Sequence, residues 1–461
     1  MLRSISATGL TKRRPGFGQT VVPAPGSVLA APTVGEGPEE PDYFFHWIRD
    51  SAVVMEAVAG RVEEGDAGAD WTGHLRDMVR FSLATTRLSG AALLRARDVR
   101  RGVQPEFLRY LRPEAELAAV EGERVLGEVR YNPDGSLDVI HWSRPQHDGP
   151  ALRALAAMRV HALGALDDDD GRQGLEELIL ADLDYTERHC GEPCYDLWEE
   201  ERGRHYYTGL VQHAALRRGA AWAGEREDRA RAERYAAAAR ALAAGLDAFW
   251  SDGLRIYRCT LRPPGAERDK VLDSAVVLGV IHAGLPDGRH SPLDDRVQAT
   301  LLALERRFAA DYAVNRGRPA GLGVAMGRFP GDRYFTGGPW YIAGFAAAEL
   351  HYRLAELLGR GAVLAVTPDN LDLGRDIAPA AGTPGARLPR AATERHALVR
   401  ALIARGDAVM AMMRRYIPAS GELSEQFDPD TGAQTSARDL SWSYAAFLTA
   451  RDARRRALRG A

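Results

Sequence analysis

The chain has 461 residues, of which 45% are hydrophobic and 27% are charged. This composition supports a packed core and excludes a disordered segment or a disulfide-stapled miniprotein. The 60 Lys and Arg residues nearly balance the 63 Asp and Glu residues, so the net charge is only −3. Such a charge recruits neither nucleic acid nor an anionic membrane, and we expect neither as a partner.

Apolar residues recur at spacings of three and four from about residue 47 onward, which predicts one helix after another. Strand-like alternation is nearly absent. Some of the predicted helices are apolar almost all round and others have a charged face, which is typical of alternating inner and outer helices. We therefore predict an all-α fold with helices at 48–64, 73–88, 149–164, 173–188, 206–222, 226–249, 273–284, 292–312, 339–358, 393–415 and 439–456.

We predict a single catalytic domain over residues 1–461, with a loop-rich segment at 1–40. No apolar run reaches the roughly 18–20 residues of a membrane span, and the basic N-terminal residues are not followed by the apolar core of a signal peptide. We therefore expect a cytoplasmic protein, or a secreted one if a signal peptide has been removed. No histidine stands at zinc-finger spacing beside the pair Cys190 and Cys194, so we expect no metal. We expect no cofactor either.

Five segments between the predicted helices are rich in Trp, Tyr, Arg and carboxylates. They cover residues 41–50, 142–150, 195–200, 327–340, and 423–428 together with 436–442. Aromatic rings pack on the apolar faces of a pyranose, while Arg and carboxylate groups bind its hydroxyls. A glycosidase needs this lining and two carboxyl groups of opposite duty. The segments therefore predict a sugar site.

Each segment also has an ordinary structural explanation. Asp50 and Asp148 stand at predicted helix starts, where an aspartate can simply cap the helix. The glutamates at 199–201 can form a solvated charge run before a helix. Three tryptophans are equally at home in a core, namely Trp198, Trp340 and Trp442. The occurrence of five such segments in one chain favours the sugar site over five separate packing accidents.

At these residues the chain resembles glycoside hydrolase family 15, the glucoamylases. The matching motifs, in family order, are Pro-Asp-Tyr with Trp-x-Arg-Asp, Trp-x-Arg-Pro-Gln-x-Asp-Gly-Pro, Tyr-Asp-Leu-Trp-Glu-Glu, Arg-x-Pro with Gly-x-Pro-Trp, and Ser-Glu-Gln-Phe-Asp with Ser-Ala-Arg-Asp-Leu-x-Trp-Ser-Tyr. They extend from about residue 28 to residue 450. The resemblance implies an (alpha/alpha)6 barrel and an inverting exo-hydrolysis that releases β-D-glucose from non-reducing ends.

The resemblance also implies roles for particular residues. Glu199 matches the general acid, Glu425 matches the general base, and Glu200 matches a substrate-binding carboxylate. The remaining matched binding residues are Tyr43, Trp47, Arg49, Asp50, Trp142, Trp198, Arg328, Trp340 and Trp442. The reaction requires the same two roles, because one carboxyl group must donate a proton while the other stays ionised. We expect the neighbouring Trp198 and Glu200 to favour the protonated form of Glu199.

Two departures from the family motifs leave the linkage preference open. His46 stands where the family usually has a small residue, and residues 201–205 are more charged than in starch-degrading members. We expect α-1,4-linked oligosaccharides as substrate, with α-1,6 hydrolysis of isomalto-oligosaccharides or dextran, or α,α-trehalose hydrolysis, as the alternatives. The presence of both Glu199 and Glu425 disfavours a barrel that only binds glucan. We expect no starch-binding domain. The sequence predicts eleven helices where the barrel needs twelve, because residues 2–15 carry a poor helix pattern.

Overall fold

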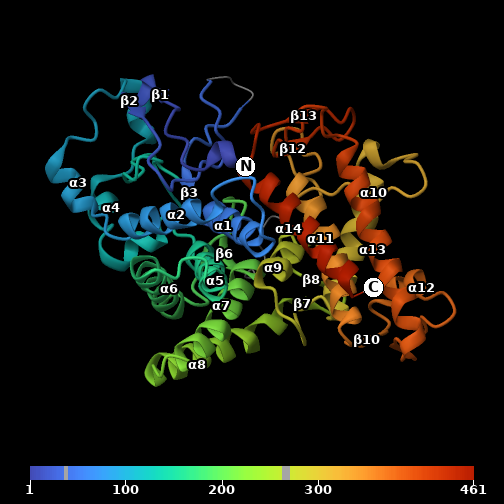
Figure 1. Cartoon of the computed structure of the whole chain (residues 1–461). Coiled ribbons are helices and arrows are strands. Elements are labelled where there is room, and N and C mark those ends of the chain that lie inside the picture. The colour runs from blue at the N-terminus through green and yellow to red at the C-terminus, as the bar shows by residue number, and fades with distance from the viewer. Residues whose placement is uncertain (36–39, 262–269, 461) are drawn as a thin grey trace. The chain divides into compact units, whose positions relative to one another are not determined.

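The computed structural model describes residues 1–35, 40–261 and 270–460. Within these ranges the helices are α1 (Ile48–Glu63), α2 (Trp71–Thr85), α3 (Gly90–Ala96), α4 (Glu114–Ala118), α5 (Asp148–Ala162), α6 (Asp169–Arg188), α7 (Tyr206–Gly224), α8 (Arg229–Leu246), α9 (Ala275–Ala283), α10 (Asp295–Asp311), α11 (Tyr341–Gly359), α12 (Leu371–Ile377), α13 (Ala392–Arg414) and α14 (Ser441–Arg459) (Figure 1). All eleven predicted helices are present, so the all-α prediction is confirmed. No helix of the described ranges is long and apolar enough to cross a membrane.

The strands are short, none longer than four residues in the described part of the chain. They are β1 (Lys12–Arg14), β2 (Gln19–Val21), β3 (His46–Trp47), β4 (Arg130–Tyr131), β5 (Cys194–Tyr195), β6 (Arg202–His205), β7 (Trp250–Ser251), β8 (Ile256–Tyr257), β9 (Thr260–Leu261), β10 (Leu364–Ala365), β11 (Arg387–Leu388), β12 (Gln426–Phe427) and β13 (Gln434–Thr435). Most of them pair antiparallel within one loop or between neighbouring loops. They fix loop conformation and build no extended sheet.

The chain forms two compact units that alternate along the sequence. The first unit consists of Met1–Arg202, Ala215–Ala239 and Asp439–Ala445, and the second of Gly203–Ala214, Arg240–Arg438 and Ala446–Ala461. Helices α7, α8 and α14 therefore contribute residues to both units.

In the first unit, α1 packs against α2 and α5, and α6 packs against the same two helices. Helix α1 is buried over most of its length, and Val54, Ala57 and Val58 have no exposed surface. Burial of such apolar side chains contributes about 1.5–3 kcal/mol for each large one. Arg49 and Asp50, in the first turn of α1, are thereby carried on a rigid element.

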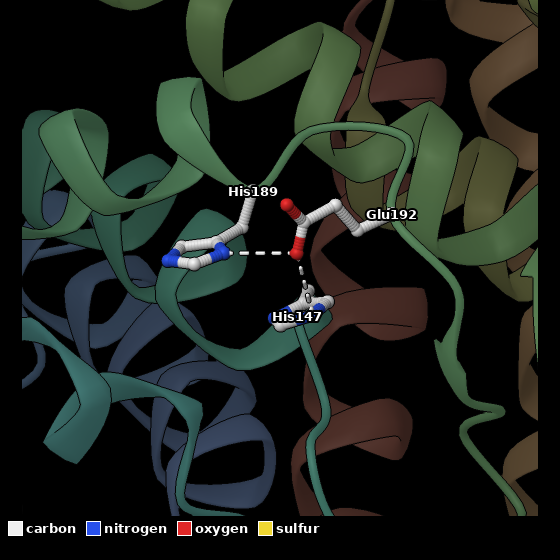
Figure 2. A group of neighbouring side chains, drawn as sticks. All are labelled: His147, His189 and Glu192. Atoms are coloured by element: carbon white, nitrogen blue, oxygen red, sulfur yellow. Dashed lines mark hydrogen bonds and ion pairs between the residues drawn. The ribbon is translucent and has the colours of Figure 1, made fainter.

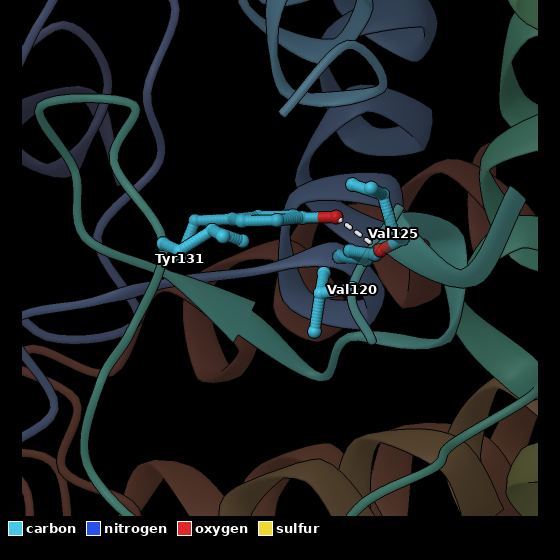
Figure 3. Close-up of a cluster of buried hydrophobic side chains, with 5 residues drawn as sticks. Val120, Val125 and Tyr131 are labelled. Atoms are coloured by element: carbon cyan, nitrogen blue, oxygen red, sulfur yellow. Dashed lines mark hydrogen bonds between the residues drawn. The ribbon is translucent and has the colours of Figure 1, made fainter. Parts of the chain in front are cut away.

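A small apolar cluster fixes the start of α1 (Figure 3). Ile48, the first residue of the helix, packs with Val120, Val125, Tyr131 and Leu137. The Tyr131 hydroxyl donates a hydrogen bond of 2.6 Å to the carbonyl oxygen of Val125, which satisfies its one polar group inside the cluster. Strand β3 pairs with β4 directly before the helix. These contacts fix the course of the backbone at residues 47–50.

In the second unit, α11 packs against α9 and α13, and α12 packs against α13. Helix α11 is buried from Tyr341 to Tyr352, in agreement with its nearly all-apolar sequence. An antiparallel bridge joins Trp340, just before the helix, to Gln426 of β12. The same hairpin pairs Gln426 with Thr435 of β13. This pairing places Glu425 at the start of α11.

Three stretches differ from what the sequence predicts. A weak helix is expected at residues 2–15, and connections without secondary structure are expected at residues 89–148 and 359–392. Residues 1–35 contain two 3-10 turns and the β1–β2 hairpin but no α-helix, so the poorly marked pattern at 2–15 reflects a true absence of an α-helix there. The connection 89–148 contains α3, α4 and β4, and the connection 359–392 contains α12 and the β10–β11 pair. These elements are too short for an apolar period to show.

Candidate active site

The carboxylate of Glu199 accepts hydrogen bonds from four side chains of the first unit. Its Oε1 accepts from Trp47 Nε1 at 2.8 Å, from Arg49 Nη2 at 3.1 Å and from Gln146 Nε2 at 3.1 Å. Its Oε2 accepts from Trp142 Nε1 at 2.5 Å. The side chain is still 15% exposed. A carboxyl group that is held this firmly and yet reaches solvent is suited to act on a bound substrate.

A tight turn presents Glu199. The Asp196 carboxylate accepts the backbone N–H groups of Glu200 at 2.8 Å and Glu201 at 3.1 Å, and the Asp196 carbonyl accepts that of Glu199 at 2.9 Å. Glu199 itself has a φ of 66°, in the left-handed region that non-glycine residues rarely adopt. Strain of this kind costs about 1–3 kcal/mol and collects at functional sites. The Ser143 hydroxyl donates to the Glu199 carbonyl at 2.6 Å and holds the turn in place.

Arg49 connects three carboxylates at the start of α1. Its Nη1 donates to Gln146 Oε1 at 2.6 Å and to Asp148 Oδ2 at 3.0 Å, while its Nη2 binds Glu199. Its Nε lies 3.9 Å from Asp50 Oδ2. Arg49 and Asp148 are both nearly inaccessible to solvent. A buried guanidinium that binds several acceptors fixes their geometry as well as their charge.

Neither Asp50 nor Asp148 occupies the N-cap position of its helix. The N-cap of α1 is Trp47 and that of α5 is His147, and neither makes a side-chain capping bond, whereas Asp50 and Asp148 lie within the first turns. Burial raises the pKa of Asp50 to about 7, with the nearby charges of Glu199 and Asp148 adding to the shift and Arg49 opposing it. Asp50 is thus a carboxyl group whose protonation changes near neutral pH.

Asp50→Asn is expected to flatten the pH dependence of stability. Because the folded-state pKa of about 7 exceeds the unfolded value of about 3.9, ionised Asp50 costs stability as pH rises between these values. The free energy of unfolding of the unsubstituted protein should lose on the order of 4 kcal/mol from this group over that window. Urea unfolding at pH 4.5 and pH 8 measures the loss, with the exposed Asp430→Asn as control. Equal pH slopes in both variants would contradict the assignment.

Aromatic rings form a wall beside Glu199. Trp47 lies edge-on to Tyr43 at 5.4 Å and to Trp142 at 6.2 Å between ring centroids. The guanidinium of Arg130 lies 3.7 Å from the Trp142 centroid and 4.9 Å from that of Trp47. Trp442, from the start of α14, lies 5.6 Å from the Arg49 guanidinium carbon. The wall therefore contains four of the predicted aromatic residues, of which Trp47 and Trp142 donate directly to the Glu199 carboxylate.

A buried network of ion pairs supports this wall. Its residues were not among those predicted from the sequence. Arg130 pairs with Asp138 at 2.8 Å, and Arg144 bridges Asp138 at 2.9 Å and Glu128 at 2.8 Å. Arg112 binds the same Glu128 through two nitrogens. Removal of one partner from such a network leaves an uncompensated buried charge. Gln146, which binds both Arg49 and Glu199, was likewise not among the predicted site residues.

Glu425 belongs to the second unit, where its backbone and side chain are both anchored. Its N–H donates to the Ala437 carbonyl at 2.8 Å, and its own carbonyl accepts the N–H of Tyr341 at 3.2 Å. The Ser436 hydroxyl donates a short hydrogen bond to Glu425 Oε2. Glu425 is only 4% exposed. A hydroxyl that donates to a carboxylate stabilises its charge, as a general base requires.

Arg328 lies in the same unit, on the loop before α11. It makes two hydrogen bonds to Asp332, at 2.7 Å and 2.6 Å, and its guanidinium carbon lies 5.0 Å from the Trp340 ring centroid. Asp332 was not among the predicted residues, although it stands four positions after Arg328 in the aromatic-rich segment 327–340. Trp198 and Glu200 occupy the Glu199 turn of the first unit, and Trp198 is buried.

Comparison with known proteins decides the family. The model of glycosyl hydrolases family 15 matches residues 17–91 and 96–452. The chain belongs to glycosyl hydrolase family 15. The chain is 29% identical over 436 residues to glucoamylase 1 of Rhizopus oryzae, an alignment that covers 92% of this chain and 67% of that protein. It is thus a glycoside hydrolase with hydrolysis of the glucoamylase type.

Solved structures of family 15 agree with the fold. The glucoamylase of Hypocrea jecorina matches with a TM-score of 0.78 and 28% identity, covering 93% of this chain and 67% of that one. The glucoamylase of Saccharomycopsis fibuligera matches with a TM-score of 0.79 and 25% identity, covering 95% and 90%. The chain therefore has the family's (α/α)6 barrel fold and spans about two thirds of the length of the Rhizopus and Hypocrea proteins.

Proposed function

We propose that this protein is an inverting, exo-acting α-glucosidase that removes terminal α-1,4-linked glucose from oligosaccharides as β-D-glucose. The observation that carries the proposal is the Glu199 carboxyl, held by Arg49, Gln146 and two indoles on a strained turn. The match to the family model covers the segment that contains Glu199, and relatives such as the Rhizopus oryzae protein are glucoamylases.

Glu199 acts as the general acid in this proposal. Its Oε1 accepts three hydrogen bonds, whereas Oε2 accepts one, from Trp142, among the residues that the structure describes. An oxygen with one donor can also carry the acidic proton, so Oε2 is the atom that protonates the glycosidic oxygen. After C–O cleavage the negative charge on Glu199 is stabilised by Arg49 and the indoles.

Glu425 acts as the general base. It takes a proton from a water molecule that attacks the anomeric carbon from the face opposite the leaving group, which inverts the configuration. The Ser436 hydroxyl stabilises the ionised form that this step needs. Inverting glycosidases separate the two carboxyl groups by about 6.5–9.5 Å, which leaves room for the water.

The remaining predicted residues bind the sugar. Aromatic faces stack on the apolar side of glucose, and charged groups hold its hydroxyls by charge-assisted hydrogen bonds. We assign the charged contacts to Arg49, Asp50, Glu200 and Arg328, and the aromatic lining to Tyr43, Trp47, Trp142, Trp198, Trp340 and Trp442. The Arg49 and Arg328 side chains are already oriented by carboxylates, which lowers the entropy cost of binding.

Parallel incubation with maltose, maltotriose, isomaltose and trehalose tests the substrate class. We expect kcat/KM for maltotriose to exceed that for isomaltose and trehalose by at least about tenfold, a discrimination of about 1.4 kcal/mol in transition-state binding. Faster turnover of isomaltose or trehalose would replace the α-1,4 assignment with one of those linkages. No turnover of any of the four sugars would overturn the proposal.

A further inference from the structure

Two histidines and a glutamate of the first unit converge beside the segment that binds Arg49 (Figure 2). His147 precedes α5, His189 follows α6, and Glu192 lies on the next loop. His189 Nδ1 lies 3.0 Å from Glu192 Oε2, and His147 Nε2 lies 3.9 Å from the same oxygen. One ligand atom from each residue lies within 4.8 Å of the other two. We propose that this cluster binds a divalent transition-metal ion of the zinc class.

The outer nitrogens of both histidines face protein groups. His147 Nδ1 lies 2.7 Å from the Tyr185 hydroxyl, within hydrogen-bond distance, whereas His189 Nε2 lies 3.9 Å from Glu123 Oε1 and has no hydrogen-bond partner among the described residues. Glu123 is itself held by Arg188 at 2.6 Å. Metal-binding histidines nearly always direct the second ring nitrogen toward an outer partner, which fixes the tautomer and the ring orientation; His147 has this arrangement, and Glu123 is the acidic group nearest to the second nitrogen of His189. The nitrogens that remain, His147 Nε2 and His189 Nδ1, are those that face Glu192.

The donor set selects the class of ion. Two imidazoles and one carboxylate suit zinc, which takes three protein ligands and leaves a fourth position for water. Calcium and magnesium prefer oxygen ligands and should bind here weakly. In the metal-free chain the His189 Nδ1 proton points to Glu192, so binding of the ion at Nδ1 requires this proton to move to Nε2, the nitrogen that faces Glu123. Glu192 is exposed, so its carboxylate can move inward to bond lengths of about 2.0–2.2 Å.

The position of the cluster gives the ion a structural role. His147 stands between Gln146 and Asp148, which both accept hydrogen bonds from Arg49. The loop of Glu192 continues to Tyr195, whose N–H donates to the Pro145 carbonyl at 3.0 Å. A bound ion therefore fastens the end of α6 to the start of α5, directly behind the Glu199 turn. Because a ligand that binds only the folded state stabilises it, zinc should raise the melting temperature.

Zinc titration of the chelator-treated protein tests the site independently of catalysis. The variants are His189→Ala and Glu192→Gln, which change partly exposed or exposed ligands and spare the buried His147. His396→Ala, which removes an exposed histidine of the second unit, is the matched control. With zinc sulfate as the only added metal, we expect one tightly bound ion per chain in the unsubstituted protein and in the control. Each ligand variant should lose at least about tenfold in affinity.

The thermal shift at a given zinc concentration should be smaller in the same two variants, and calcium chloride should produce no comparable shift in the unsubstituted protein. The proposal is overturned if His189→Ala and Glu192→Gln bind zinc as tightly as the unsubstituted protein. It is equally overturned if the unsubstituted protein binds no stoichiometric zinc. Neither readout uses sugar hydrolysis, so the glucosidase assignment and the metal site stand or fall separately.

Discussion

Glu199→Gln and Glu425→Gln are each expected to lower kcat by about 10²–10⁴-fold, the usual contribution of a general acid or base. Each substitution removes a proton-transfer role and preserves the size of the side chain. Maltotriose should therefore still bind, because the aromatic wall and Arg49 remain. Steady-state kinetics gives kcat, and calorimetric titration of the inactive variants gives the affinity.

Two neighbouring glutamates supply matched controls for this pair. The controls are Glu201→Gln and Glu422→Gln. Glu201 lies on the same turn as Glu199, and Glu422 is an exposed residue shortly before Glu425. Both controls should retain most of the turnover. If Glu199→Gln or Glu425→Gln keeps more than about a tenth of the activity, the role of that residue is wrongly assigned.

Arg49→Met is expected to destabilise the protein and to inactivate the molecules that remain folded. The substitution leaves Asp148 and Glu199 without their buried guanidinium, and loss of one partner of a buried pair costs about 3–5 kcal/mol. Glu199 also loses one of the donors that fix its carboxylate. Urea unfolding and kcat/KM, measured where the variant is folded, report the two effects.

Arg153→Met separates the two effects. Arg153 makes hydrogen bonds of 2.9 Å and 2.8 Å to Asp182, and both side chains are fully buried between α5 and α6. We expect a comparable loss of stability, about 3–5 kcal/mol, with kcat/KM of the folded fraction nearly unchanged. A similar loss of kcat/KM in both variants would mean that Arg49 acts only through stability.

Most of the long helices could be predicted from sequence because their apolar spacing follows the helical period over four or more turns. Helix α11, for example, is nearly apolar all round and is buried as its pattern indicates. The Glu199 turn could also be anticipated as a functional loop, because Trp198 and two glutamates stand together between helices. Its left-handed φ could not, since that conformation depends on Asp196 accepting backbone N–H groups across the turn.

The ion network behind the wall could not be predicted because its partners pair across irregular connections. Arg130 and Asp138 are eight residues apart on strands and loops that show no period, and the stacking of Arg130 on Trp142 depends on tertiary packing. The histidine cluster could not be predicted either, because its members are far apart in the sequence. His147 and His189 are separated by the whole of α5 and α6, so no ligand spacing is visible in the sequence. Asp332, in contrast, stands four positions after Arg328 and could have been recognised as its partner.

The anomeric configuration of the first glucose released tests the central assignment most directly. Maltotriose is incubated with the unsubstituted protein in an NMR tube, and the anomeric proton signals are followed before mutarotation becomes significant. Inversion by Glu199 and Glu425 predicts that β-D-glucose is formed first and that the α anomer grows only afterwards. Initial release of α-D-glucose would indicate retention through a covalent intermediate and would contradict the inverting mechanism, in which Glu425 is a general base and not a nucleophile.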